Sequence, residues 1–267
     1  MCPPVHFDVR YAINPWMDPS VPVDRRRALA QWEQLVAAYE SYGHRVGVLP
    51  AAPGLPDMVY AANGATVIDG RALLARFAHP ERRAETRHHR RWHRAARAVH
   101  QLDAVNEAEG DFAVLGSAVL AGYGFRTDRR AHAELARLTG RRVVSLELVD
   151  PRFYHLDVAL AVLDGTRQHV AYYPPAFSPA SRRVLRRLFP DAVIATSADA
   201  YAFGLNCVSD GRHVFLPRRA EHLVAALEAG GYRPVPIELD ELHKGGGSVK
   251  CCTQELRPAP GRDDDAN

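Results

Sequence analysis

The sequence predicts an α/β fold built from repeats of one unit, in the order strand, strand, helix, strand. Helix-like segments begin at intervals of roughly 40 to 56 residues, a spacing typical of repeat architectures. Pairs of apolar or alternating runs lie between these segments, and a further short strand follows each helix. The helix-like segments begin near Val23, Pro80, Asp128, Ser178 and Arg218. Five such units can close into a ring around a central pit, and a plain two-layer α/β domain is the alternative.

Local signals support the individual elements. Asp24, Pro80 and the pair Ser178-Pro179 stand at predicted helix starts, because Asp and Ser side chains cap helices and proline suits the first turn. They open predicted helices over residues 25–42, 81–99 and 180–189. The predicted strand pairs are 58–68 with 72–77, 112–115 with 118–122, and 158–162 with 169–173. The strands predicted to follow helices are 46–49, 143–148 and 192–195.

Size and charge narrow the class of protein. The chain has 267 residues and is 47% hydrophobic, so it can bury a full core without disulfides or metal ions. We predict a single α/β domain over residues 1–257 and a disordered, proline-rich and acidic tail over 258–267. A formal net charge of +3 is too small to indicate a nucleic-acid partner. The basic run 82–97 is expected to be a solvated helix face.

The cysteines and the first residues indicate the compartment. Cys2, Cys207, Cys251 and Cys252 have neither the spacing of a disulfide framework nor that of a metal site. Residues 1–11 lack the continuous apolar segment of a secretory signal, and no apolar run is long enough for a membrane span. We therefore expect a cytoplasmic protein with free thiols and no membrane contact. Phosphate-loop and dinucleotide patterns are missing, so no cofactor and no metal are expected.

The first candidate for chemistry is the glycine-rich segment that ends in Cys251. Three glycines, residues 245–247, allow a close backbone approach that can present a thiol at the start of a strand. Lys250 lies beside this thiol and would help to lower its pKa. The alternative is that Cys251 and Cys252 are small buried core residues.

The second candidate is the pair His155 and Asp157. Side chains alternate along a strand, so on a strand these two would face the same side. A histidine and a carboxylate together can serve as a general acid/base and an anchor for a cation. The alternative is a hydrogen-bonded histidine at a strand edge.

Acidic and amide side chains form the remaining candidates. Glu107, Glu109 and Asp111 lie around a glycine just before an apolar strand, in an ordinary polar turn or in the lining of a cavity for a cation. Asp57 and Asn63 stand at the two ends of a strand-like run. Each signal is weak alone. Together they place one nucleophile, one acid/base and several carboxylates at the ends of different repeat units.

Seven motifs, in this order along the chain, resemble those of the guanidino-group-modifying superfamily. That superfamily includes arginine deiminase, dimethylarginine dimethylaminohydrolase, arginine dihydrolase and the amidinotransferases. The resemblance extends from Phe7 to Leu256 and implies a five-bladed α/β propeller, or pentein, in agreement with the five predicted units. The motifs are Ile13-Asn14-Pro15-Trp16-Met17, residues 56–63, His79-Pro80-Glu81-Arg82, Glu109-Gly110-Asp111, Gly124-Phe125-Arg126, His155-Leu156-Asp157, and the Gly-Gly-Ser-Val-Lys-Cys segment ending at Cys251.

The resemblance also implies roles for ten residues. The catalytic residues are Cys251 as nucleophile, His155 as general acid/base and Glu109 as its partner carboxylate. The substrate-binding residues are Asp157 for the guanidinium nitrogens, Arg82 and Arg126 for the α-carboxylate, and Asn14, Asp57, Asn63 and Asp111 for the rest of the pocket. The acidic motif departs from the more usual Glu-x-Gly-Asp spacing. The division of roles among Glu107, Glu109 and Asp111 therefore stays open.

These residue types suit hydrolysis of a guanidinium C–N bond. Resonance makes the guanidinium carbon a poor electrophile, so attack needs a thiolate, which the cationic substrate can help to form. Carboxylates orient the planar cation through charge-assisted hydrogen bonds. His155 gives a proton to the leaving amine and later takes one from water. The intermediate is a covalent S-alkylthiouronium.

The identity of the substrate depends on Asn63, which stands where deiminases and many dimethylaminohydrolases carry an acid. That difference resembles the arginine dihydrolases, so the favoured reaction is arginine to ornithine, CO2 and ammonia. Hydrolysis of dimethylarginine to citrulline and dimethylamine is the alternative, and amidino transfer is third. A non-catalytic arginine-binding protein is the hypothesis from another class. The expected partner is a small guanidino compound, and a homo-oligomer is among the open assembly states.

Overall fold

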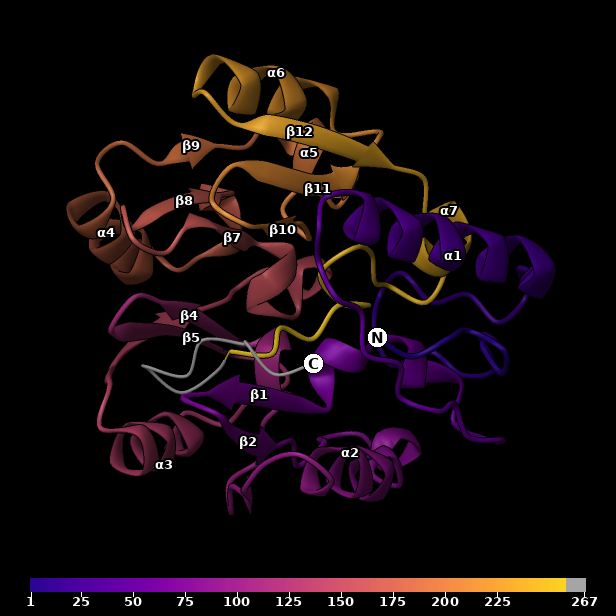
Figure 1. The fold of residues 1–267 in the computed structure, drawn as a ribbon. Helices are drawn as coiled ribbons and strands as arrows, with labels where there is room; N and C mark the ends of the chain where they lie inside the picture. Colours follow the sequence, from indigo (N-terminus) through magenta and orange to yellow (C-terminus); the bar gives the residue numbers. More distant parts are fainter. Residues whose placement is uncertain (258–267) are drawn as a thin grey trace.

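The computed structural model describes residues 1–257, and the predicted disordered tail 258–267 lies outside this part of the chain. The fold is α/β: four three-stranded sheets surround the middle of the molecule, and helices lie around the rim (Figure 1). In every sheet two consecutive strands form an antiparallel hairpin, and the third strand pairs in parallel with the second. A helix connects the second and third strands, as a parallel crossover requires.

The four sheet units follow one another along the chain. The first is β1 (Ala65–Ile68), β2 (Arg71–Leu74), α2 (Glu85–Arg94) and β3 (Val99–Gln101). The second is β4 (Phe112–Leu115), β5 (Ala118–Tyr123), α3 (Arg130–Thr139) and β6 (Arg142–Glu147). The third is β7 (Leu160–Asp164), β8 (His169–Tyr172), α4 (Pro179–Leu188) and β9 (Val193–Ile194). The fourth is β10 (Val208–Ser209), β11 (His213–Pro217), α6 (Glu221–Ala229) and β12 (Arg233–Ile237). Outside these units lie α1 (Arg25–Ser41), α5 (Ser197–Tyr201) and α7 (Asp240–His243).

Helix starts follow the predicted capping chemistry. The Asp24 carboxylate accepts a hydrogen bond from the Arg27 N–H at the start of α1. The Ser178 hydroxyl accepts one from the Ser181 N–H, and Pro179 occupies the first position of α4. Both caps satisfy backbone donors that have no partner within the helix. The order strand, strand, helix, strand is thus confirmed for four units.

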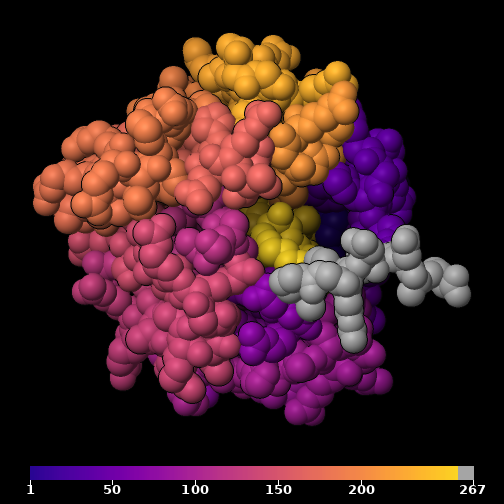
Figure 2. Space-filling model, turned by 60° about the vertical axis from the view of Figure 1, so that its left-hand side comes forward, coloured from indigo at the N-terminus to yellow at the C-terminus, as the bar shows by residue number. Residues whose placement is uncertain are grey.

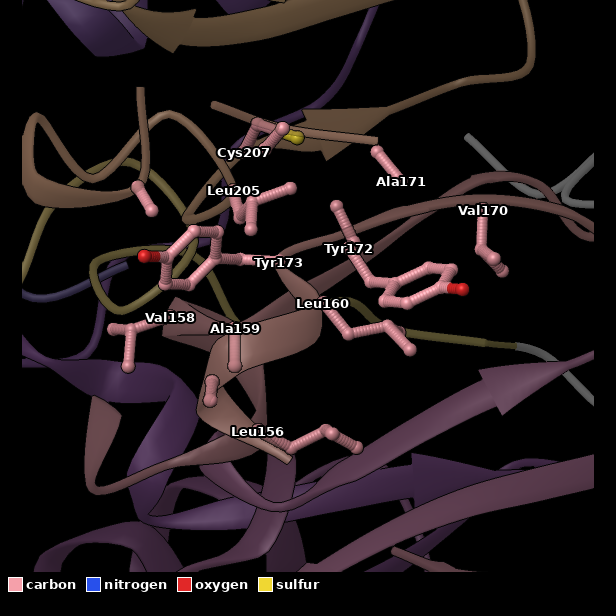
Figure 3. Close-up of a cluster of buried hydrophobic side chains, with 14 of the residues drawn as sticks. Leu156, Val158, Ala159, Leu160, Val170, Ala171, Tyr172, Tyr173, Leu205 and Cys207 are labelled. Carbon is pink, nitrogen blue, oxygen red and sulfur yellow. The ribbon is translucent and has the colours of Figure 1, made fainter. Parts of the chain in front are cut away.

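The largest apolar cluster extends over the second, third and fourth units. Figure 3 shows Leu156 and Leu160 on one side and Leu205 and Cys207 on the other, with Tyr172 between them. All five side chains are buried. Burial of each large apolar side chain stabilises the fold by about 1.5–3 kcal/mol, so this cluster holds the turn before β7 in place.

Three predicted elements are wrong: one does not form, and two are shorter than predicted. No strand forms at residues 46–49; there Leu49 N–H donates to the Met1 carbonyl at 2.8 Å, and the terminal amine donates to Gly47. Residues 58–64 are not extended, because 3₁₀ turns at Pro56–Val59 and Ala61–Asn63 precede the strand. The helix predicted over 81–99 is only α2, since a separate 3₁₀ turn forms at Pro80–Arg82 and residues 99–101 join the sheet.

The basic helix α2 has a solvated face, as predicted. Arg87, Arg91 and Arg94 are exposed, whereas His89 and His93 point inward and are buried. Across residues 1–257, no helix combines the length and the apolar character needed to cross a membrane.

The turns before the first strands face the middle of the molecule. Three of them are 3₁₀ turns, Ala61–Asn63 before β1, Ala108–Gly110 before β4 and Leu156–Val158 before β7. A similar turn precedes β10, where Asn206 N–H donates to the Phe203 carbonyl at 2.9 Å. Figure 2 shows the yellow C-terminal segment set deep between the surrounding units. The fold therefore brings five separate stretches of chain to one central place.

Candidate active site

The proposed site residues converge because their turns touch. The turn Ala61–Asn63 contacts Ala108–Gly110, which in turn contacts Leu156–Val158. The Ala62 N–H donates to the Cys251 carbonyl at 3.0 Å, which joins the C-terminal segment to the same group. A Cβ atom on Gly110 would lie 2.4 Å from Asn63 Nδ2 and 3.2 Å from two carbons of the His155 ring. Only a glycine fits there, so Asn63 and His155 approach each other closely across it.

His155 pairs with a carboxylate, and that carboxylate is Glu107. The distance between His155 Nε2 and Glu107 Oε2 is 2.9 Å, and both side chains are buried. Arg126 Nη1 donates to both oxygens of Glu107, at 3.1 and 2.9 Å. Burial alone would raise the pKa of Glu107, but Arg126, His155 and Arg82 outweigh it and hold this pKa far below its usual range. Glu107 is therefore a permanent anion that orients the imidazole.

The prediction that Glu109 is the partner of His155 is wrong in this structure. Glu109 accepts hydrogen bonds from Lys250 Nζ at 2.6 Å and from Arg257 Nη1 at 2.7 Å. It thereby holds the C-terminal segment rather than the imidazole. Between Glu107 and Glu109 lies Ala108, whose backbone is left-handed with φ 50°. Because of this unusual conformation, the side chains of Glu107 and Glu109 point in different directions and bond to different partners.

Cys251 lies in a turn that follows the glycine-rich segment, not at the start of a strand as predicted. Its Sγ is 3.4 Å from Asp157 Oδ2 and 3.1 Å from Asn206 Nδ2. Burial, followed by the charge of Asp157, raises the pKa of the Cys251 thiol well above its ordinary value. Lys250 was expected to lower that pKa, but its ammonium group donates hydrogen bonds to Glu109 and Glu255 instead.

Asp157 also departs from the strand that was predicted for it. Leu156–Val158 is a 3₁₀ turn, so His155 and Asp157 do not share a strand face. Burial raises the pKa of Asp157 to about 7, against lowering contributions from Cys251, Lys250 and Asn206. The carboxyl group thus changes charge near neutral pH, directly beside the thiol.

The two arginines predicted to bind an α-carboxylate are both buried and already paired. Arg82 donates to both oxygens of Glu85 at 3.0 and 2.9 Å, and its Nη1 donates to Asn63 Oδ1 at 3.0 Å. Arg126 is held by Glu107 and by the Ile13 carbonyl at 2.7 Å. In this structure, both arginines fix the positions of neighbouring site residues.

The other predicted pocket residues are hydrogen-bonded within the same region. Asn14 Nδ2 donates to the Gly245 carbonyl at 3.1 Å, which fastens the N-terminal loop to the glycine-rich segment. Asp57 Oδ2 accepts from the Tyr11 hydroxyl at 2.9 Å. Asp111 Oδ1 accepts from the Leu156 N–H at 3.0 Å, which fixes the turn that carries Asp157.

Part of this polar site lacks partners in the free protein. Within residues 1–257, five buried site atoms have no hydrogen-bond partner: Asp57 Oδ1, Asn63 Nδ2, Asp111 Oδ2, His155 Nδ1 and Asp157 Oδ1. Three of them are carboxylate oxygens, which only accept hydrogen bonds when ionised. Buried polar groups are normally paired, so this concentration marks a place where a donor-rich cation can bind.

Sequence reasoning missed Tyr11, Glu85 and Asn206. Tyr11 carries no local signal, because its partner Asp57 becomes a neighbour only through the fold. Glu85 stands three residues after Arg82, a spacing that brings an acid and an arginine together locally. Asn206 did carry a signal. It stands two residues before β10, as Asn63 stands two residues before β1, although Gly110 and Val158 hold this place before β4 and β7.

The pKa of Asp157 predicts how stability depends on pH. A pKa raised from 3.8 to about 7 means that folding disfavours the ionised form, so this group's contribution is fully favourable only below its unfolded pKa and is lost as pH rises through 7. We expect Asp157→Asn to be more stable than the unchanged protein by up to about 4 kcal/mol at pH 8, and equal to it near pH 3.5. Urea unfolding across this pH range measures the difference. A constant difference at all pH values would contradict the prediction.

Comparisons with known proteins identify the family of this chain. The family model for eukaryotic N,N dimethylarginine dimethylhydrolase matches residues 11–258. The N(G),N(G)-dimethylarginine dimethylaminohydrolase of Mycobacterium tuberculosis is 55% identical over 263 residues, covering 97% of this chain and 85% of that protein. The bifunctional arginine dihydrolase/ornithine cyclodeaminase ArgZ of Synechocystis is 36% identical over 261 residues, covering 95% of this chain and 37% of that protein.

Solved structures of the N-terminal domain of ArgZ are also similar. One is bound to substrate and another is covalently bound to a reaction intermediate; each has a TM-score of 0.91, 34% identity and 97% coverage of both chains. The fold and these relatives together define a member of the guanidino-group-modifying superfamily, an enzyme that hydrolyses C–N bonds of guanidino groups. The chain belongs to the dimethylarginine dimethylaminohydrolase family.

Proposed function

We propose that this enzyme hydrolyses N-methylated arginine to citrulline and the methylamine. One observation carries the proposal: a buried thiol lies beside Asp157, in a site where one carboxylate oxygen each of Asp57, Asp111 and Asp157 has no donor within residues 1–257. A guanidinium group supplies a planar set of N–H donors with positive charge, which matches these acceptors. The 55% identity to a dimethylarginine dimethylaminohydrolase supports the methylated substrate.

The proposed reaction uses residues whose geometry suits each step. When the cationic substrate binds, its charge favours the thiolate of Cys251, whose pKa burial keeps high in the free enzyme. The sulfur attacks the guanidinium carbon and a C–S bond forms. His155 takes up the proton that the thiol loses and gives it to the dimethylamine as the C–N bond breaks. His155, oriented by Glu107, then takes a proton from water; the hydroxide attacks, the C–S bond breaks and citrulline departs.

This proposal reverses the order of the two reactions that the sequence suggested. Asn63 favoured an arginine dihydrolase, and that reaction remains the second candidate because Asn63 leaves an amide, Nδ2, unpaired at the site. An acid at this position would hold the guanidinium more strongly than an amide does. The high identity to the dimethylaminohydrolase outweighs this single residue.

We also propose that the four sheets belong to a five-bladed propeller. The fifth unit would consist of α1, the stretch near Met1 and Leu49, and the C-terminal segment around Cys251. Backbone hydrogen bonds from Leu49 to Met1 and from Gly70 to Arg257 support this assignment. The four buried, free cysteines suit the cytoplasm, where thiols stay reduced.

Product analysis tests the function. Purified protein is incubated separately with asymmetric dimethylarginine and with arginine, and the products are separated. We expect citrulline and dimethylamine from the methylated substrate. Ornithine with two ammonia per arginine would instead support the dihydrolase. No product from either substrate would overturn both candidates.

A further inference from the structure

Asn206 is the residue most closely tied to the proposed nucleophile. It is fully buried and lies in the turn that precedes β10. Its Nδ2 donates to Cys251 Sγ at 3.1 Å and to the Asp157 carbonyl at 3.2 Å. Its Oδ1 accepts from the N–H groups of Ser248 and Cys251, each at 3.1 Å. The Asn206 carbonyl also accepts from the Lys250 N–H at 3.1 Å.

These contacts fix the orientation of the amide. The two N–H donors of Nδ2 meet two acceptors, and the two lone pairs of Oδ1 meet two donors, so the hydrogen-bonding capacity of the side chain is filled. A flipped amide would place its N–H groups against the N–H groups of Ser248 and Cys251. The nitrogen must therefore face the sulfur.

The contact with Sγ has a direct electrostatic consequence. An N–H···S hydrogen bond is stronger when the sulfur is a thiolate, because the acceptor is then charged. Asn206 thus favours the ionised sulfur over the neutral one, in opposition to burial and to the Asp157 carboxylate. The donor is already in position before any substrate binds, so no reorganisation is needed at the moment of attack.

We propose that Asn206 is a catalytic residue that holds the Cys251 turn in place and donates an N–H to the reacting sulfur, which stabilises the thiolate. This inference rests on the proposed role of Cys251 as nucleophile. Asn206 performs two separable tasks. The oxygen Oδ1 positions the turn through two backbone N–H groups, and the nitrogen Nδ2 stabilises charge on the sulfur.

The test separates these tasks with Asn206→Asp. Aspartate keeps an oxygen for the Ser248 and Cys251 N–H groups, but it replaces the donor to Sγ with a negative charge. In the full chain, Cys251 is labelled with iodoacetamide over a range of pH and the labelled peptide is quantified. We expect the midpoint of labelling to rise by at least about one pH unit, since a lost donor and a new anion both disfavour the thiolate. We expect kcat to fall by about 10²–10³-fold and KM to change little.

Two further variants keep the result interpretable. Asn206→Ser removes the amide without adding charge, and it replaces Asn206→Asp in the experiment if the aspartate variant does not fold. We expect a smaller rise in the labelling midpoint for the serine variant. Asn106→Asp is the matched control, because Asn106 is also buried and its side chain, within residues 1–257, bonds only to the backbone of Ala104 and Ala108. It should leave the labelling midpoint of Cys251 unchanged. An unchanged midpoint in both Asn206 variants, or an equal rise in the control, would overturn the proposal.

The labelling experiment is independent of turnover. If the product analysis finds no guanidino hydrolysis but the Asn206 variants still shift the labelling of Cys251, the thiolate role of Asn206 stands and the proposed function fails. If turnover is found but the midpoint does not move, the proposed function stands and the role of Asn206 fails.

Discussion

Cys251→Ala is expected to abolish turnover, with a loss of at least about 10⁴-fold in kcat, because it removes the sulfur that attacks the guanidinium carbon. Alanine removes the sulfur that lies 3.4 Å from Asp157 and 3.1 Å from Asn206. The fold should persist, since loss of one small buried group costs about 1 kcal/mol. The carboxylates that would bind the guanidinium remain, so the variant should still bind substrate. Calorimetric titration with dimethylarginine and a turnover assay measure the two properties on one sample.

Cys252→Ala is the matched control for this experiment. Cys252 is also fully buried, follows Cys251 directly, and is packed in the same apolar cluster. Its substitution should therefore cost comparable stability and leave kcat within a few-fold of the unchanged enzyme. Full activity in Cys251→Ala would refute the covalent mechanism, and loss of activity in Cys252→Ala alone would move the nucleophile by one residue.

The repeat order could be predicted because each unit carries its own signals. Apolar alternation, helix caps such as Asp24 and Ser178, and regular spacing act over short stretches of chain. These signals failed where backbone geometry depends on distant contacts. Residues 56–63 are apolar and resemble a strand, yet they form 3₁₀ turns, in which Asp57 meets Tyr11 and Asn63 meets Arg82. Tertiary hydrogen bonds override the local preference there.

The composition of the site could be predicted, but the pairing of its charges could not. Cys251, His155 and several carboxylates do gather in the middle of the fold. The acid that contacts the imidazole is determined by the left-handed backbone at Ala108. Alanine rarely adopts φ 50°, so the sequence does not indicate this conformation. The contacts of Arg82 with Asn63 and of Arg126 with Glu107 are likewise set by the fold.

The two glutamates also show why this site tolerates so much buried charge. Glu107 is paired with Arg126, and Glu109 is paired with Lys250 and Arg257. Each buried anion has a cationic partner, and breaking such a pair is far more costly than never having formed it. The exceptions are three aspartates of the site, Asp57, Asp111 and Asp157, each of which has one oxygen without a donor within residues 1–257. The unpaired aspartates therefore make the free protein less stable than full pairing would, and a bound cationic substrate would raise its stability.

Glu107→Gln is expected to lower turnover, whereas Glu109→Gln is expected to lower stability. The two variants together test whether Glu107, and not Glu109, is the partner of His155. Glutamine at 107 removes the anion that orients and stabilises the protonated His155, so kcat should fall by about 10²–10⁴-fold. Glutamine at 109 leaves this pair intact and weakens the bonds to Lys250 and Arg257, so unfolding free energy should fall by about 1–3 kcal/mol. Its kcat should change far less. Turnover and urea unfolding are measured for both variants.

Stability must be separated from catalysis in the first variant, because Arg126 loses a charged partner when Glu107 becomes neutral. Turnover is therefore measured well below each unfolding transition and expressed per folded molecule. His155→Asn provides a second route to the same step, since it removes the acid/base and leaves the bond between Glu107 and Arg126 in place. We expect its kcat to fall as far as that of Glu107→Gln. If Glu109→Gln lost turnover while Glu107→Gln kept it, the sequence-based assignment of Glu109 would be correct after all, and the contact between Glu107 and His155 would be structural.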